Sequence, residues 1–195
     1  MSVIKSRMQI LASAFYLVLV CGISAAAQTG TDEIEWSTAK LSWSDFKGTP
    51  KAMRAVAMTN SGIYFNYGQS GDGTLNFTIV SNFDKKQSWV KPEGRKDEVL
   101  RHEQLHFDIS ELHARLLRKY FTEQSFPARK NLGGVIKRYY KEQIQELNRM
   151  QNKYDSETNN GTRAEAQKKW EERVALELKK LDAFTQHIIV RRVVK

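Results

Sequence analysis

The sequence predicts an α+β domain in which an antiparallel sheet is followed by three helices. Two patterns lead to this prediction. Between residues 53 and 83 apolar and polar residues alternate, which is the period of a half-buried strand. After residue 96 apolar residues recur at helical spacing in three separate stretches. The chain has 195 residues, of which 41% are hydrophobic, so we expect one domain with a substantial core.

The first 27 residues have the three-part pattern of a secretory signal peptide. Lys5 and Arg7 precede the apolar run "ILASAFYLVLVCGISAAA", which ends in small residues. We therefore predict a signal peptide over residues 1–27, cleaved after Ala27 to leave Gln28 as the new N-terminus. The exported protein would be periplasmic or extracellular. The alternative is that the segment stays attached as an N-terminal membrane anchor.

The composition of the predicted mature chain excludes cysteine-based chemistry and makes the chain basic. The only cysteine, Cys21, lies in the predicted signal peptide, so no disulfide, thiolate ligand or cysteine nucleophile would remain. The formal charge is +9, and removing Lys5 and Arg7 leaves +7, because 9 − 2 = 7. Such a basic surface either serves solubility alone or binds anionic components of the cell envelope. We expect a monomer with no nucleic-acid partner.

Strands are expected first along the mature chain. Residues 28–40 form a polar lead-in, and the domain proper is expected over 41–195. The stretch "GQSGDGT" contains Asp72-Gly73 and enough glycine for a hairpin connection. On either side of it, alternating apolar residues predict two antiparallel strands: Ile63, Phe65 and Tyr67 before it, and Leu75, Phe77 and Ile79 after it.

Three helices are expected next. The first covers about 96–120 and the second about 135–152, both with apolar residues on one side. Thr162 and Glu165 have the spacing of a capping box, which predicts the start of the third helix. The tail "HIIVRRVVK" is rich in β-branched residues and predicts a short final strand.

The predicted first helix carries the chemistry. His102 and His106 are four residues apart, so their side chains lie on one helical face, about 6 Å apart, and can share a metal ion. Glu103 comes directly after His102, so its side chain points to one side of the two imidazoles. There it can reach a water molecule on the metal without binding the metal itself. A zinc ion would lower the pKa of that water, and Glu103 would accept its proton. The alternative is a pair of solvent-facing histidines.

The other two histidines are poor candidates for ligands. His113 lies seven residues after His106, about 10 Å further along the helix axis, and we expect it at the surface or behind the ligands. His187 belongs to the tail, and we expect it to make no contact with the site.

Three stretches of the chain resemble a bacterial family of unknown function, domain of unknown function 922, whose members are described as predicted secreted zinc-dependent proteases. They are "WSDFKGTP" at 43–50, "HEQLHFDISELHAR" at 102–115 and "YDSETNNGTRAEAQKKW" at 154–170. The resemblance implies a zincin-like metallopeptidase domain over 41–195, with a sheet over an active-site helix. It also implies that His102 and His106 are ligands and that Glu103 is the base.

The sequence does not identify the third metal ligand directly. In that family a histidine often precedes the glycine after the Tyr-Asp-x-x-Thr pattern, but this chain has Asn160 there. A catalytic zinc ion usually has three protein ligands. The candidates are Asp155, Glu157, Asn160 and His187, and we choose Asp155, because its short side chain sits where the second helix should end. The alternative is that Asp155 only bonds loop amides.

Tyr154 is the remaining candidate. Its hydroxyl group is proposed to stabilise the oxyanion of the reaction, and the alternative is that it closes the apolar face of the second helix.

Two functions from different classes remain. The first is a secreted or periplasmic zinc metallopeptidase, in which a zinc-bound water activated by Glu103 hydrolyses a peptide or protein substrate. The second is a non-catalytic, basic module that binds the cell envelope and retains the same fold.

Overall fold

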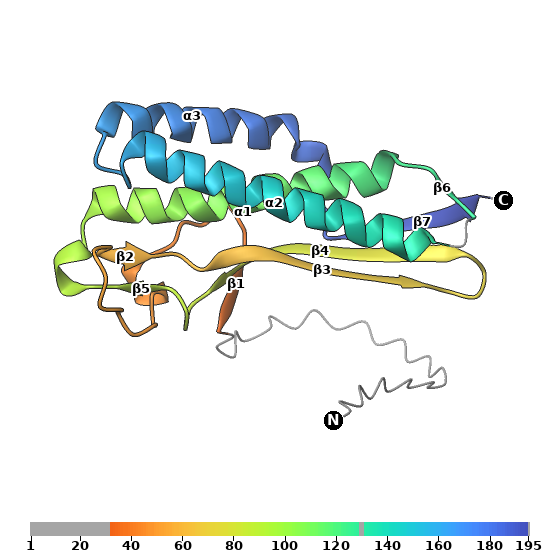
Figure 1. Cartoon of the computed structure of the whole chain (residues 1–195), viewed down its shortest axis with the longest axis horizontal. Coiled ribbons are helices and arrows are strands. Elements are labelled where there is room, and N and C mark those ends of the chain that lie inside the picture. The colour runs from red at the N-terminus through yellow and green to blue at the C-terminus, as the bar shows by residue number, and fades with distance from the viewer. Residues whose placement is uncertain (1–31, 129–130, 195) are drawn as a thin grey trace, which may run out of the picture. The chain divides into compact units, whose positions relative to one another are not determined.

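The protein was analysed as a computed structural model that describes residues 32–128 and 131–194. The predicted signal peptide, residues 1–27, lies outside the described residues. The described part is an α+β domain (Figure 1). Its strands are β1 (Glu33–Glu35), β2 (Ala57–Met58), β3 (Ser61–Gln69), β4 (Thr74–Asp84), β5 (Trp89–Val90), β6 (Phe126–Pro127) and β7 (Ile188–Val194). Its α-helices are α1 (Asp97–Glu123), α2 (Leu132–Thr158) and α3 (Ala164–Lys180). Single turns of 3₁₀-helix form at Trp43–Asp45, Pro92–Gly94 and Asp182–Phe184.

Strand β4 is the centre of the main sheet. One of its edges pairs with β3 along the predicted antiparallel hairpin, from Leu75 opposite Gln69 to Phe83 opposite Ser61. Its other edge is shared by β7 near the hairpin and by β1 at the far end. Strand β6 extends the sheet beyond β7 as the one parallel pair among the described strands. The predicted alternation is confirmed, since the side chains of Leu75, Phe77 and Ile79 are buried.

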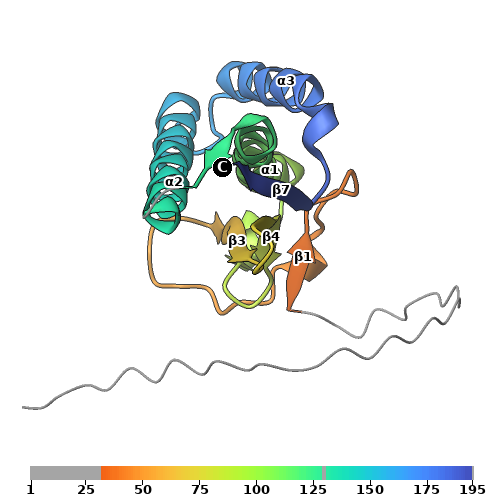
Figure 2. The same cartoon turned by 90° about the vertical axis from the view of Figure 1, so that its right-hand side faces the viewer.

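Helix α1 lies on the sheet and is flanked by α2 and α3, as the end-on view shows (Figure 2). Because it is covered on several sides, α1 buries most of its length, including Leu105, Ile109, Leu112 and Leu117. Its far end stacks aromatic rings on the sheet, with the ring centroids of Phe121 and Phe77 4.4 Å apart. The helix that carries both histidines is therefore held rigidly by the core.

Charged side chains on α1 are buried as a paired group. Glu111 is 3% exposed and accepts hydrogen bonds from Arg115 and Arg118 at 2.9 and 2.8 Å. Arg118 also donates to the carbonyl oxygen of Ile79, and Arg115 to that of Leu178. Burial of these charges is tolerable because each has a partner. The group links α1 to the sheet and to α3.

A smaller sheet of β2 and β5 lies beside the first turns of α1. It covers a second apolar cluster, which comprises Leu41, Phe46, Ala57, Phe83, Val90 and Phe107. The segment that contains β2 leads directly to the site described below. None of the helices in the described ranges is both long enough and apolar enough to span a membrane.

Three boundaries differ from the sequence predictions. The expected lead-in, 28–40, contains β1, because its residues find hydrogen-bond partners on β4, far away in the sequence. Helix α2 runs to Thr158 rather than stopping near residue 152. The capping box of Thr162 and Glu165 is not formed, and Arg163 occupies the N-cap position of α3 without a side-chain cap. The hydroxyl group of Thr162 instead donates to the carbonyl oxygen of Asn159 at 2.8 Å.

Candidate metal centre

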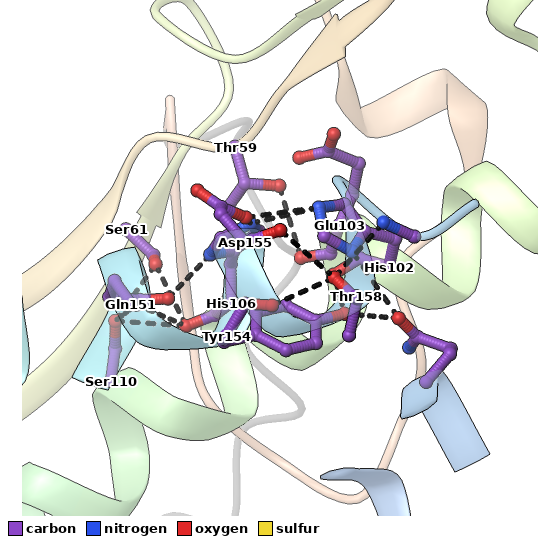
Figure 3. Close-up of polar contacts among 12 residues, drawn as sticks. Thr59, Ser61, His102, Glu103, His106, Ser110, Gln151, Tyr154, Asp155 and Thr158 are labelled. Atoms are coloured by element: carbon purple, nitrogen blue, oxygen red, sulfur yellow. Dashed lines mark hydrogen bonds and ion pairs between the residues drawn. The ribbon is translucent and has the colours of Figure 1, made fainter. Parts of the chain in front are cut away.

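Helices α1 and α2 bring together three side chains that could hold a metal ion. His102 and His106 come from α1, and Asp155 comes from the last turn of α2 (Figure 3). This is the one such group among residues 32–128 and 131–194. The structure thus brings together the two predicted histidine ligands and the third ligand chosen from the sequence, although their metal-binding role stays a prediction.

Helical spacing explains how the two imidazoles face each other. They lie one turn apart on α1, with ring centroids 4.8 Å apart and ring planes at 86°. Asp155 reaches them because α2 continues past the expected end, so its position is set by helix geometry and not by a loop. The helix ends at Asn159, whose φ of 49° is left-handed.

The three potential donor atoms form a small triangle. The Nε2 atoms of His102 and His106 are 3.2 Å apart. Asp155 Oδ1 lies 3.2 Å from Nε2 of His102 and 3.0 Å from Nε2 of His106. A tetrahedral zinc ion with ligand atoms at about 2.1 Å would place adjacent donors about 3.4 Å apart. An expansion of a few tenths of an ångström would therefore accommodate zinc.

A buried polar atom without a hydrogen bond supports the same assignment. Asp155 Oδ1 is buried, yet it accepts no hydrogen bond of acceptable geometry from the described residues. A buried carboxylate oxygen without a partner destabilises the folded state unless another donor or a cation binds to it. One carboxylate and two imidazoles are also the donor types that zinc prefers. The residues present therefore fit a zinc ion.

The electrostatics of the triangle favour a bound cation. Burial would raise the pKa of Asp155, but its contacts with the imidazoles of His102 and His106 hold that pKa well below its usual range. Burial would likewise lower the pKa of His106, but the Asp155 and Glu103 carboxylates raise it overall. Negative charge thus gathers at this point on the α1 surface and stabilises positive charge there.

Glu103 shares a cavity with the triangle. The cavity has a volume of about 740 Å³ and is lined by Glu103, the three potential ligands, Asn160 and the segment 54–59. The Glu103 side chain is 5% exposed and has no hydrogen bond from the described residues. The helix is held there by the hydroxyl group of Thr59, which donates to the Glu103 carbonyl oxygen at 3.1 Å. This leaves the carboxylate available for a water molecule.

Tyr154 lies behind the histidines and not in the cavity. It is fully buried, and its ring stacks on His102 with centroids 4.7 Å apart. Its hydroxyl group donates to Gln167 Oε1 at 2.7 Å and lies 3.2 Å from the carbonyl oxygen of His102. Burial raises the pKa of Tyr154, so the hydroxyl stays protonated. This placement favours a supporting role over the predicted oxyanion role.

A turn with left-handed backbone follows α2 and packs against His102. Asn159, Asn160 and Gly161 have φ values of 49°, 53° and 77°. A Cβ atom on Gly161 would lie 2.9 Å from both Cβ and Cγ of His102, so only glycine fits this approach. Asn160 lines the cavity at its exposed rim.

The other candidates lie elsewhere. The carboxylate of Glu157 accepts a hydrogen bond from Trp170 Nε1 at 2.8 Å and so faces α3. His187 lies 3.6 Å from Glu35 Oε2, so it pairs with β1 and does not join the site. His113 is 5% exposed, so of its two expected positions, at the surface or behind the ligands, the surface position is wrong. The sequence pattern failed there because α2 covers the face of α1 that carries it.

Two residues that contact the histidines were not identified from the sequence. Gln151 Oε1 meets Nδ1 of His106, and Gln167 Oε1 meets Nδ1 of His102. Gln151 lies four residues before Asp155, so a helix extended to 158 would have placed it on the same face. The sequence held no comparable signal for Gln167, which comes from α3.

A second cavity, of about 520 Å³, lies against the opposite face of α1. It is bordered by Trp36, Leu41, Leu100 and Leu178, with Asp108 and Glu171 among its charged residues. It shares no residue with the metal centre, and no group of three potential metal ligands was found there among the described residues. The chemistry therefore points to the first cavity.

Comparison with known proteins gives one match. A family model described as "Bacterial protein of unknown function (DUF922)" matches residues 47–161, which is 115 of 195 residues, because 161 − 47 + 1 = 115. The matched region contains Glu103 and the whole triangle. No curated protein and no solved structure matches the chain at a significant level.

Proposed function

The chain belongs to the DUF922 family of bacterial proteins of unknown function, and we propose that it is a zinc-dependent metallopeptidase. The observation that carries the proposal is the convergence of His102 Nε2, His106 Nε2 and Asp155 Oδ1 within 3.0–3.2 Å of one another beside Glu103. His102, His106 and Asp155 would hold the ion. Bound zinc would supply Lewis-acid chemistry, which lowers the pKa of water and polarises a carbonyl group.

The cavity would position the substrate, and Glu103 would transfer the protons. The substrate peptide enters the cavity between α1 and the segment 54–59, which brings its carbonyl carbon next to the reacting water. Glu103 accepts the proton of that water as the water attacks the carbonyl carbon. It then delivers the proton to the leaving amine nitrogen when the C–N bond breaks. Burial of Glu103 keeps competing water away from this transfer.

Export is part of the proposal. We propose that residues 1–27 direct the chain out of the cytoplasm and are removed after Ala27, so that the enzyme acts as a periplasmic or extracellular monomer. N-terminal sequencing of the protein from the native envelope should begin at Gln28. An intact Met1 in a membrane-embedded product would contradict this.

The decisive test of the chemistry is the Glu103→Gln variant. Purified wild-type protein loaded with zinc should cleave members of an unbiased peptide library. Glu103→Gln should reduce that cleavage by about 10²–10⁴-fold, the usual contribution of a general base, while zinc binding stays intact. Glu98→Gln is the matched control, because Glu98 lies on α1 but is exposed and outside the cavity. Equal activity of Glu103→Gln and wild type would contradict the assignment.

The second candidate function is a non-catalytic, basic module that binds the cell envelope. The observation in its favour is the charge of +7 that the predicted mature chain carries, from 9 − 2. It predicts that the zinc-loaded wild type cleaves nothing in the library, yet sediments with vesicles that contain anionic lipid at low salt. Glu103→Gln should not change that sedimentation.

A further inference from the structure

Each of the two histidines is held from behind by a glutamine. Nδ1 of His106 lies 2.5 Å from Oε1 of Gln151, and Nδ1 of His102 lies 3.3 Å from Oε1 of Gln167. The Nε2 atoms point the other way, toward Asp155 (Figure 3). Each ring therefore has one nitrogen directed at an amide and the other at the triangle.

The orientation of both amides is determined by their other contacts. The amide nitrogen of Gln151 donates to the carbonyl oxygen of His106 at 2.9 Å, so Oε1 must face the imidazole. The amide nitrogen of Gln167 donates to Glu171 Oε1 at 2.9 Å, and its Oε1 accepts the hydroxyl proton of Tyr154. A reversed amide would place the Gln167 oxygen against the Glu171 carboxylate in the second case and lose the bond to the carbonyl in the first.

An amide oxygen can only accept a hydrogen bond, so the nitrogen that faces it must carry the proton. We propose that Gln151 and Gln167 are positioning residues that fix His106 and His102 as their Nδ1–H tautomers. Both Nε2 lone pairs then face Asp155 Oδ1 before any metal arrives. This inference rests on the metal-binding part of the proposed function and does not require hydrolysis.

The arrangement explains why α3 belongs to the site although it supplies no ligand. Gln167 is 2% exposed, and its Oε1 contacts both the Tyr154 hydroxyl group and Nδ1 of His102, so α3 sets the orientation of a candidate ligand on α1. When both rings are neutral Nδ1–H tautomers, three acceptor atoms converge without a donor and repel one another. The two glutamines hold them in place despite this repulsion, and a cation relieves it.

The tautomers are measured directly in the metal-free protein. Long-range ¹H–¹⁵N spectra of the histidine rings, recorded at a pH where the rings are neutral, should show Nδ1–H for both His102 and His106. Gln151→Met removes the acceptor and should return His106 to a mixture of tautomers while His102 is unchanged. The control is Gln143→Met, since Gln143 is also half-buried on α2 but bonds to Tyr139, away from the site. An Nε2–H form of either ring in the wild type overturns the proposal.

Zinc affinity gives the second readout, by titration against a competing chelator. Gln151→Met should weaken zinc binding by about 10–100-fold, as expected for a group that orients a ligand. Gln151→Glu keeps an acceptor at the same place and should retain affinity within about threefold of the wild type or better. Gln143→Met should change nothing. If Glu is as damaging as Met at position 151, the residue acts by packing alone and the proposal fails.

Gln167 is likewise replaced by Met and by Glu. Because this residue is buried, near-UV circular dichroism checks that both variants fold. Gln167→Met should affect the tautomer of His102 and not that of His106. If Gln167→Met does not fold, the tautomer spectra and zinc affinities of the variants at the half-buried Gln151 test the proposal on their own. If the wild type binds no zinc, the proposed function fails, while the tautomer spectra still decide whether the glutamines position the rings.

Discussion

Asp155 and Glu157 show how position on one helix turn decides which carboxylate joins the candidate metal centre. Both are acidic, and both were candidates for the third ligand. Positions two apart on a helix point in different directions, so only one of them can face α1. Asp155 lies 3.0 Å from His106 Nε2, whereas Glu157 bonds to Trp170. The difference is a matter of helical phase and not of chemistry.

The first prediction separates these two residues. Asp155→Ala should weaken zinc binding by at least tenfold and abolish hydrolysis, because it removes one of three ligands. Glu157→Ala, the matched control two positions away, should leave zinc affinity within about threefold, as should Asn160→Ala. Affinities come from titration against a competing chelator. Unchanged affinity in Asp155→Ala, with a large loss in Glu157→Ala, would show that the assignment is wrong.

The second prediction concerns Gly161, whose φ is 77°. Gly161→Ala should lower the free energy of unfolding by about 1–2 kcal/mol through the left-handed backbone alone. Its Cβ would also press on His102, 2.9 Å away, so zinc affinity should fall by about tenfold or more. Gly68→Ala is the control, because nothing lies within 4 Å of a Cβ there. Urea unfolding and chelator titration measure both effects, and equal results for the two variants would contradict the prediction.

At the residue scale, the sequence predicts what local spacing determines. The separation of His102 and His106 by four positions is enough to place both rings on one face. Asp155 was chosen from its position near the expected helix end, and it reaches the histidines from within an extended helix instead. Gln167 could not be found, since its contact with His102 spans 65 residues and no periodic pattern connects them.

At the scale of elements, the strands and helices follow from periodicity, but their ends depend on contacts. The 96–120 prediction lies within α1, Asp97–Glu123. Helix α2 extends to Thr158 because its last turn packs against α1, with Tyr154 stacked on His102. Strand β1 forms in a polar segment because β4 offers it an open edge. Such tertiary contacts override local signals such as the unformed Thr162–Glu165 capping box.

The third prediction belongs to the packing of α1 against α2. His113 is 5% exposed, and its ring nitrogens have no hydrogen-bond partner among the described residues. Burial lowers its pKa to about 4, with Glu146 and Gln143 opposing the shift. In the unfolded chain the imidazole has a pKa of about 6.5 and takes up a proton first as the pH falls. The unfolded state therefore gains protons between these two values, and stability decreases as the pH is lowered.

Between pH 8 and pH 5 this should cost the wild type about 2 kcal/mol of unfolding free energy. His113→Leu should not show this loss, so the two unfolding free energies should approach or cross as the pH falls. Urea unfolding of both metal-free proteins at several pH values measures it. The other titrating groups are the same in both proteins and cancel. Parallel pH profiles would show that His113 can be protonated in the folded state.

At the scale of the whole molecule, the order of strands before helices led to the correct α+β class. The parallel β6–β7 pair was not anticipated, because it joins Phe126 to Val193 across most of the helical region. The family match over residues 47–161 covers the hairpin, α1 and α2, including the complete triangle.

The fourth prediction concerns metal and global stability. A ligand at about 1,000 times its Kd stabilises the folded state by about 4 kcal/mol. For a domain of this size that corresponds to a rise in Tm of about 8–16 °C. Scanning calorimetry with zinc and with chelator should show this rise for the wild type and for His187→Ala, whose imidazole pairs with Glu35.

The contrasting variant is His102→Ala, which should show no rise in Tm with zinc. A wild-type protein that is purified without chelator and offered zinc should hold about one equivalent. If it holds less than about a tenth of an equivalent, the metal centre does not exist.

The separation of the candidate ligands along the chain has a consequence for how a metal ion would hold the domain together. His106 and Asp155 are 49 positions apart, from 155 − 106. An ion bound to both would close a loop of that length in the folded chain, and it would stabilise that state because the separated ligands of the unfolded chain form no preformed site. Secreted domains often obtain this restraint from disulfides, but the only cysteine here is Cys21, in the predicted leader. The restraint would then respond to acidity and metal supply, and it would be indifferent to reductants.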